Sequence, residues 1–114
     1  MMDKADVEKS KVFMAVEVIE YVPNSVVIKT IIKKSTGDVT LTALDVGETL
    51  SEKISPFDTF SQILEGNAEI VIGGKSIMLQ TGESIIIPAH IKNKIKANER
   101  FKMISTIIKS GYES

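Results

Sequence analysis

The chain of 114 residues has no cysteine, no tryptophan, one histidine and one arginine. Without cysteine it has no disulfide, no thiolate metal ligand and no thiol nucleophile. Aromatic residues make up 5% of the chain, and with one arginine they offer none of the basic, stacking surface that binds nucleic acids. No hydrophobic run approaches the roughly 20 residues that cross a bilayer, and the polar N-terminus lacks a signal-peptide core. These absences predict a cytoplasmic protein with no membrane or nucleic-acid partner.

The most abundant side chains are β-branched. The chain contains 17 isoleucines, 10 valines and 8 threonines against 5 leucines. β-branched side chains lose rotamer freedom in helices and pack well on pleated sheets, so this composition indicates an all-β fold. Turn residues recur about every 8 to 12 positions, which is typical of a sandwich or barrel. The length and the absence of a linker-like stretch predict one domain over residues 1–114.

Hydrophobic periodicity bounded by turn residues predicts eight strands. The pair Gly73-Gly74 indicates a hairpin turn, and Glu65-Gly66-Asn67 a tight turn. Residues 1–11 are expected to form a loose or short helical N-terminal arm. The predicted strands are Ser25–Lys33, Val39–Val46, Phe60–Leu64, Ala68–Ile72, Ser76–Gln80, Ser84–Ile87, Ile91–Ala97 and Phe101–Lys109.

The charge of the chain is unevenly distributed. The net charge is −1, but residues 91–114 carry six basic and two acidic side chains, whereas residues 1–90 carry eight basic and thirteen acidic ones. The lysines of residues 91–97 alternate with apolar side chains, which is typical of a strand with one solvated face. We therefore interpret the basic end as a solvated strand surface.

The same alternation places the amide of Asn93 among the inward-facing positions. Residues 91, 93, 95 and 97 are apolar except for Asn93, and the residues between them are all lysine. A buried amide without partners costs about 1–3 kcal/mol, so Asn93 needs hydrogen bonds. Two interpretations stay open: a structural residue bound to main-chain groups, or a residue that lines a pocket.

Glycine and proline positions in residues 47–66 and 82–97 resemble the two motifs of the cupin superfamily. The first motif of that family contains His-x-His and a glutamate between two glycines, and the second contains Pro-x-Gly followed by a histidine and an asparagine. The resemblance implies an antiparallel jelly-roll, or double-stranded β-helix, barrel with its cupin-like core at residues 39–108. The positions that carry it are Gly47, Pro56, Asp58, the corner Ile63–Gly66, Gly82, Ile87 and Pro88-Ala89.

The chain departs from the cupin pattern at the metal ligands. When the motifs are registered on their glycines and proline, Lys53 and Ser55 stand at the first two histidine positions. Thr59 stands at the glutamate position and Asn93 at the third histidine position. None of these is a good transition-metal ligand, so we expect no metal cofactor. An alternative with relocated metal ligands would use Glu48, Glu52 or Asp58.

The single imidazole, His90, stands where many cupins have the glycine of Pro-x-Gly. Because alternation points Ile91 and Asn93 inward, we expect His90 at the rim of the barrel. The other interpretation makes His90 a displaced ligand or a general base.

The resemblance brings the substituted positions together in one cavity. Lys53 and Ser55 lie two apart and are expected to share one strand face. A lysine there would hold a carboxylate or phosphate, or act as a base or Schiff-base amine. The first hypothesis is therefore a metal-free barrel that binds a small polar or anionic molecule through Lys53, Ser55, Thr59 and Asn93, with His90 at its rim.

Two other functions stay open. One is a metal-independent enzyme of the isomerase or lyase type, with Lys53 or His90 as proton carrier. The other is a sensory domain that serves a separate DNA-binding partner. The resemblance also implies a homodimer paired through its sheets. Phe60 alternates out of phase with Thr59, so it is expected to face away from the cavity, toward a partner or a second sheet.

Overall fold

The structure, a computed structural model, describes residues 7–109, and for Glu52 and Lys53 it describes the backbone alone. It confirms an all-β fold of antiparallel strands, with one turn of 3-10 helix, η1 (Ala15–Glu17). The strands are β1 (Val26–Lys34), β2 (Gly37–Leu44), β3 (Thr49–Lys53), β4 (Thr59–Ile72), β5 (Lys75–Gln80), β6 (Ser84–Ile87), β7 (Asn93–Lys96) and β8 (Phe101–Ile108).

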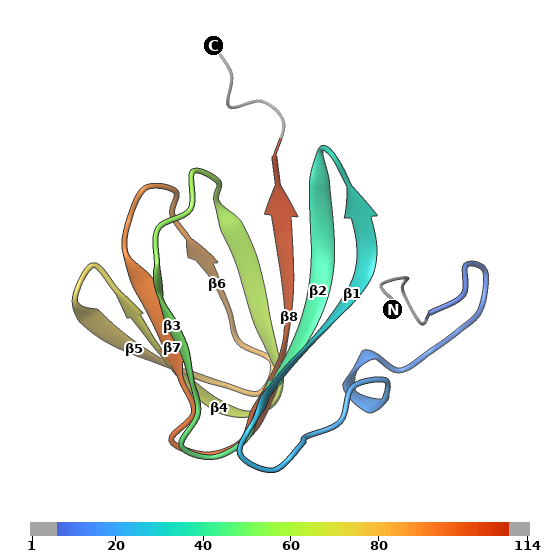
Figure 1. The fold of residues 1–114 in the computed structure, drawn as a ribbon, viewed down its shortest axis with the longest axis horizontal. Helices are drawn as coiled ribbons and strands as arrows, with labels where there is room; N and C mark the ends of the chain where they lie inside the picture. The colour runs from blue at the N-terminus through green and yellow to red at the C-terminus, as the bar shows by residue number, and fades with distance from the viewer. Residues whose placement is uncertain (1–6, 110–114) are drawn as a thin grey trace.

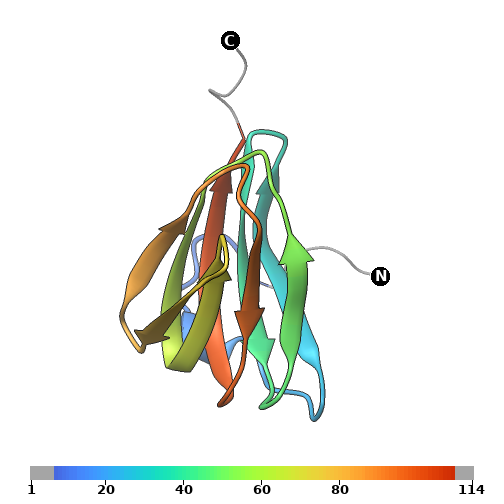
Figure 2. The same cartoon turned by 90° about the vertical axis from the view of Figure 1, so that its left-hand side faces the viewer.

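The strands curl around a common interior as two sheets that share β4 (Figures 1 and 2). In the first sheet, the neighbours are β1, β2, β8, the first half of β4, and β6. In the second sheet, they are β3, β7, the second half of β4, and β5. Because β4 passes from one sheet to the other, it joins them along one side. This arrangement confirms the predicted jelly-roll barrel.

The tight turn predicted at Glu65-Gly66-Asn67 is wrong. Strand β4 runs without a break from Thr59 to Ile72, and its pairing with β8 slips by one residue between Ile63 and Glu65. Gly66 has φ +91°, and a Cβ atom there would collide with the main-chain oxygen of Arg100. The glycine therefore allows a bulge that bends the strand from one sheet into the other, a common use of bulges in barrels.

The hydrophobic core lies at one end of the barrel, which we call the base. Leu44, Ile63, Ile70 and Phe101 are completely buried there, and alanines such as Ala68 fill the narrower gaps between them. The opposite end, which we call the mouth, is formed by the loops that follow β3 and β6. The inner strand faces thus meet in a packed base and diverge toward the mouth.

Residues 7–25 form an arm that lies beside β1 and covers part of the outer face of the first sheet (Figure 1). Ile19, which is 1% exposed, packs on Leu41 and Ala43 of β2. Two ammonium groups hold the arm, one at a residue within η1 and one at the residue that follows it. Lys102 Nζ donates to the carbonyl oxygen of Val16 at 2.7 Å, and Lys29 Nζ donates to that of Val18 at 2.6 Å.

A second set of polar contacts ties the end of the arm to the base. The Tyr21 ring lies 4.2 Å from the guanidinium carbon of Arg100, and its hydroxyl donates to Glu65 at 2.7 Å. Burial, followed by the hydrogen bond to Glu65, raises the pKa of Tyr21 well above its usual value. Asp45 accepts a hydrogen bond from the main-chain N–H of Asn24 at 2.8 Å. That main-chain bond is the largest of the interactions that lower the pKa of Asp45.

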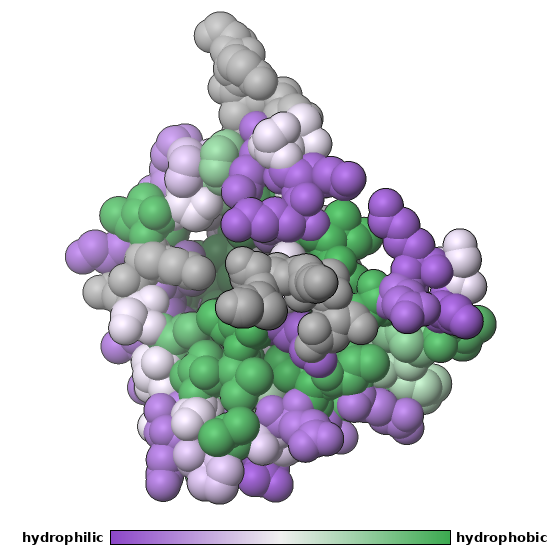
Figure 3. Space-filling view, turned by 45° about the vertical axis from the view of Figure 1, so that its right-hand side comes forward, coloured by the Kyte–Doolittle hydropathy of each residue, from purple (hydrophilic) through white to green (hydrophobic). Residues whose placement is uncertain are grey.

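Figure 3 shows the molecule turned to bring the side of the arm forward, with hydrophobic residues gathered in the lower half of the view and hydrophilic ones around them. Among residues 7–109, no helix is long and apolar enough to cross a membrane.

Candidate functional site

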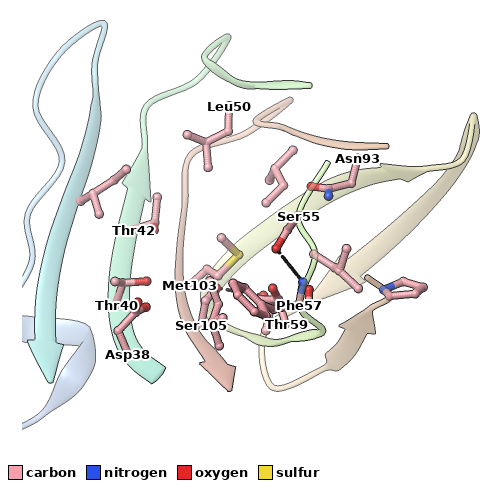
Figure 4. A pocket seen from close by; sticks show the side chains of 16 residues that line it. Asp38, Thr40, Thr42, Leu50, Ser55, Phe57, Thr59, Asn93, Met103 and Ser105 are labelled. Carbon is pink, nitrogen blue, oxygen red and sulfur yellow. Dashed lines mark hydrogen bonds between the residues drawn. The ribbon is translucent and has the colours of Figure 1, made fainter. Parts of the chain in front are cut away.

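A cavity of about 270 Å³ opens between the two sheets near the mouth. Its apolar lining includes Leu50, Ile87, Ile95 and Met103, which adjoin the core. Its polar lining contains six hydroxyl groups, one amide and one carboxylate. These polar residues are Asp38, Thr40, Thr42, Ser55, Thr59, Ser61, Asn93 and Ser105 (Figure 4).

Three of the hydroxyl groups form a row across three neighbouring strands. Thr40 of β2 is the register partner of Ser105 of β8, and Ser105 is in turn the register partner of Ser61 of β4. Directly opposite residues in antiparallel strands project on the same face, so the three side chains stand side by side on the inner wall. The Oγ atoms of Ser61 and Ser105 lie 2.8 Å apart and form a hydrogen bond, in which either can be the donor.

The row is one level in a gradient of side-chain polarity, which decreases from the mouth to the base. The level nearer the mouth has Asp38, Ile107 and Thr59 in register. The levels toward the base become progressively apolar because threonine and serine give way to methionine, isoleucine, leucine and phenylalanine. These deeper levels are Thr42, Met103 and Ile63, followed by Leu44 and Phe101. The polar groups therefore lie toward the mouth, while the base packs as a core.

Two loops meet at the mouth and are bonded to each other. The carbonyl oxygen of Ser55 accepts a hydrogen bond from the main-chain N–H of His90 at 2.7 Å. The carboxylate of Asp58 accepts another from the main-chain N–H of Ala89 at 2.8 Å. The hydroxyl of Ser55 accepts a bond from the main-chain N–H of Phe57 at 3.1 Å, which closes a local turn. These bonds fix the shape of the opening.

The structure brings together three of the five predicted site residues. Ser55, Thr59 and Asn93 line the cavity, and Asn93 is 5% exposed, as the alternation predicts. Ser55 does not share a strand with Lys53, because β3 ends at Lys53 and Ser55 lies in the following loop. Lys53 pairs with Asn93 in register, and the side chain of Lys53 lies outside the part that the structure describes.

His90 is exposed and lies outside the set of residues that line the cavity, in agreement with the predicted rim position. Its φ is +67°, in the left-handed region that favours glycine. This backbone conformation explains why glycine suits the same corner in the cupin motif.

Sequence reasoning missed four hydroxyl groups of the cavity: Thr40, Thr42, Ser61 and Ser105. A signal was present in β2, where polar residues 38, 40 and 42 alternate with apolar residues 39, 41 and 43. Such alternation is usually interpreted as polar side chains facing solvent and apolar ones facing the core. Here the polar side chains face the cavity, and the arm covers the apolar side chains of Leu41 and Ala43 from outside.

The described donors at the cupin metal positions do not fit a divalent transition metal. Ser55 and Thr59 offer neutral hydroxyl groups and Asn93 offers an amide, whereas such metals bind imidazole, carboxylate or thiolate. Of the alternative carboxylates, Asp58 is held by Ala89 in the loop contact. Within residues 7–109 whose side chains are described, no three His, Asp or Glu side chains come together to hold a metal.

The charge on the described cavity lining is balanced. Its single carboxylate, Asp38, forms an ion pair with Lys109, whose Nζ lies 3.4 Å from Asp38 Oδ2. The remaining described polar groups of the lining are neutral hydroxyls and the Asn93 amide. Such a lining can exchange hydrogen bonds with a ligand in both directions, because each hydroxyl both donates and accepts.

A family model described as "Ethanolamine utilisation protein EutQ" matches residues 6–113. Among solved structures, a conserved protein of unknown function from Streptococcus pyogenes is 26% identical, with a TM-score of 0.88 over 100% of this chain and 98% of that one. A cupin superfamily protein from Desulfitobacterium hafniense is 27% identical, with a TM-score of 0.82 over 92% of this chain and 95% of that one.

A cupin 2 conserved barrel domain protein from Leptotrichia buccalis is 30% identical, with a TM-score of 0.80. That match covers 82% of this chain and 46% of that one, so the Leptotrichia protein is about twice as long as the matched segment. No curated protein matches the chain. Together these similarities confirm the resemblance to the cupin superfamily.

Proposed function

The chain belongs to the EutQ family, within the cupin superfamily, and we propose that its barrel binds a small, uncharged, hydroxyl-bearing molecule without the help of a metal. The observation that carries this proposal is the row of Thr40, Ser105 and Ser61 on the inner wall of a cavity. It lies in the same cavity as Ser55, Thr59 and Asn93, which replace three of the residues that bind metal in other cupins.

The polar lining favours a ligand over an empty interior. A core that served stability alone would be filled by apolar side chains, because a buried hydroxyl without a partner costs about 1–3 kcal/mol. The lining of this cavity instead includes six hydroxyl-bearing residues. A ligand with several hydroxyl groups would exchange hydrogen bonds with these side chains, and the apolar surfaces of Met103 and Ile95 would contact its carbon atoms.

The size of the cavity limits the ligand. At about 30 Å³ for each water-sized group, a volume of 270 Å³ holds a molecule of roughly nine non-hydrogen atoms. The pairing of Asp38 with Lys109 favours an uncharged molecule, because the charge at that position is already compensated. Recognition of an anion would depend on Lys53.

The test is a titration of the labelled protein with four probes, followed by nuclear magnetic resonance. Glycerol is the neutral polyhydroxylated probe, acetate and phosphate are the anions, and ethanolamine, an amino alcohol, is the compound after which the EutQ family is described. We expect glycerol to shift the signals of residues in β2, β4 and β8 near the mouth. The Ser105→Ala variant should weaken that binding about fivefold, the effect of one lost hydrogen bond of about 1 kcal/mol.

Thr106→Val is the matched control because Thr106 is the next residue of β8 and faces the other side of the sheet. It should leave the affinity for glycerol unchanged. Treatment with a chelator should also leave it unchanged, and a loss of binding would overturn the metal-free part of the proposal. Binding of acetate or phosphate alone, abolished by Lys53→Met, would overturn the uncharged class, and no response to any probe would overturn the proposal as a whole.

A further inference from the structure

A second cavity, of about 550 Å³, lies outside the barrel, between the start of the arm and the end of β1. Residues 7–11 and Phe13 of the arm line one side of it, and residues 31–34 of β1 line the other. Figure 1 shows the start of the arm, in deep blue, to the right of β1. We call this space the arm groove. The described residues that line it all differ from those that line the barrel cavity, so the two are separate.

A bulge in β1 makes one wall of the arm groove apolar. The pairing of β1 with β2 shifts by one residue just before Ile32, so Ile31 is an extra residue in β1. Side chains of a regular strand alternate between its faces, but a bulge allows two consecutive ones to lie on the same side. Ile31 packs against the cluster around Ile19, and Ile32, which is 50% exposed, lines the groove beside it. Val7 and Phe13 line the groove from the arm, so both walls carry apolar side chains.

Lysine side chains from both walls surround this apolar surface. They are Lys9, Lys11, Lys33 and Lys34. All four are exposed, and within the described part of the chain none of them forms an ion pair. Glu8 is the one acidic residue among the described lining residues, and Asp38, the register partner of Lys33, is already paired with Lys109. Four ammonium groups against one carboxylate give the groove a positive charge that the described residues do not neutralise.

We propose that the arm groove binds a free anionic amphiphile, a molecule that joins a carboxylate to an alkyl chain as a fatty acid does. The alkyl chain would lie along Ile31, Ile32 and Phe13, where its contact with water is removed. The carboxylate would accept hydrogen bonds from the ammonium groups at the rim. A purely apolar ligand would leave the lysines unused, and a small anion would leave the apolar walls in water. The chemistry of the groove therefore favours a ligand with both parts.

The size of the arm groove sets the length of the alkyl chain. At about 30 Å³ for each water-sized group, a volume of 550 Å³ holds roughly 18 non-hydrogen atoms. The medium-chain fatty acid laurate is smaller than this limit and is the probe of choice. Because the groove has a wall on each side, it suits one enclosed alkyl chain rather than the surface of a bilayer. This site is independent of the ligand of the barrel, which would be uncharged and much smaller.

The test is a titration of the labelled protein with laurate below its critical micelle concentration, followed by nuclear magnetic resonance. We expect laurate to shift the signals of residues 7–13 and 31–34. Dodecyltrimethylammonium carries the same alkyl chain on a cation, and acetate carries the same carboxylate without the chain. Each of these two probes should bind the groove at least about tenfold more weakly than laurate, because each lacks one of the two parts.

Two variants examine the two parts of the arm groove separately. Lys11→Gln combined with Lys34→Gln should weaken laurate binding about fivefold, the effect of two exposed charge contacts. Ile32→Ser should weaken it by a similar factor through the apolar wall. Lys75→Gln combined with Lys92→Gln is the matched control, because it removes the same charge from two exposed lysines of the second sheet, one in β5 and one just before β7. It should leave the affinity for laurate unchanged, and circular dichroism checks that each variant is folded.

Several results would overturn the proposal. Equal binding of either other probe would show that the charge or the alkyl chain is not recognised, and an equal loss in the control variant would show non-specific attraction. Shifts confined to β2, β4 and β8 near the mouth would place laurate in the barrel. Binding to vesicles of phosphatidylglycerol without binding of free laurate would make the groove a membrane contact, and no response to laurate would leave the groove without this ligand class.

Discussion

Replacing Ser105 by alanine removes the hydrogen-bond partner of a buried hydroxyl group. Ser61 is 1% exposed, and its Oγ lies 2.8 Å from that of Ser105. The truncation therefore leaves a polar atom without its partner in a nearly sealed position. Such a change costs about 1–3 kcal/mol, and the low exposure of Ser61 places the expected loss at about 2 kcal/mol. For a domain of this size that corresponds to a fall in melting temperature of roughly 8 °C.

The double variant Ser61→Ala with Ser105→Ala separates this loss from other effects of truncation. Removing both hydroxyl groups leaves no unpaired atom, so we expect a loss of about 1 kcal/mol, smaller than that of either single variant. The assay is urea denaturation followed by circular dichroism, with the free energies of unfolding combined in a double-mutant cycle. Ser76→Ala is the control because Ser76 bonds Glu69 on an exposed surface, and it should change stability by less than about 0.5 kcal/mol.

Two results would refute the reasoning. If the losses of the single variants add up in the double variant, the two hydroxyl groups do not depend on each other. If Ser105→Ala lowers the free energy of unfolding by less than about 0.5 kcal/mol, the Ser61 hydroxyl instead forms a hydrogen bond with a water molecule in the cavity. The pair is then accessible to water.

Four further predictions concern the mouth, the arm and the base. His90→Gly should raise the free energy of unfolding, measured by thermal denaturation, by about 0.5–1 kcal/mol, because it relieves a left-handed conformation at φ +67°. A decrease in the free energy of unfolding would contradict this prediction. Lys102→Met should cost about 1–2 kcal/mol and speed amide exchange in the arm, because the Val16 carbonyl loses a charge-assisted bond of 2.7 Å; unchanged exchange would show that the arm is held elsewhere. The pKa of Asp45 is lowered by folding, so the stability it contributes is present above its unfolded value of about 3.9 and is lost as the pH falls through its folded value. Asp45→Asn should therefore flatten the fall of stability in acid, measured by urea denaturation from neutral pH downward. The pKa of Tyr21 is raised, so the stability it contributes is complete below about pH 10 and decreases as alkali ionises the unfolded chain; Tyr21→Phe should abolish that decrease.

The fold was predictable because strand signals are local. The pair Gly73-Gly74 closes a hairpin between β4 and β5 as predicted, since the turn needs only positive φ at these two residues. The segment Glu65-Gly66-Asn67 has equally strong turn residues, but it continues β4, just after a bulge between Ile63 and Glu65 against β8. A local pattern does not distinguish a chain reversal from a bend between sheets, because the difference lies in which distant strand pairs with the segment.

The candidate site was less predictable. Whether a strand side chain lies in the interior or in solvent depends on what covers each side of the sheet. Asn93 was identified because it interrupts an apolar alternation that faces inward. Thr40 and Ser105 were missed because polar residues normally face water, and only the arm, packed on Leu41, reverses that assignment in β2. Tertiary packing decides which side of the strand the arm covers. The alternation of polar and apolar residues in the strand carries no information about it.

The decrease in side-chain polarity from mouth to base separates the residues of the hydrophobic core from the polar residues that line the cavity. Leu44, Phe101 and Ile63 close the base with the apolar burial that drives folding, two or three register levels away from Thr59. A mutation at the mouth therefore has little influence on the nucleus of the core. Under the proposed function, single substitutions at the mouth would exchange one specificity for another while the same architecture persists.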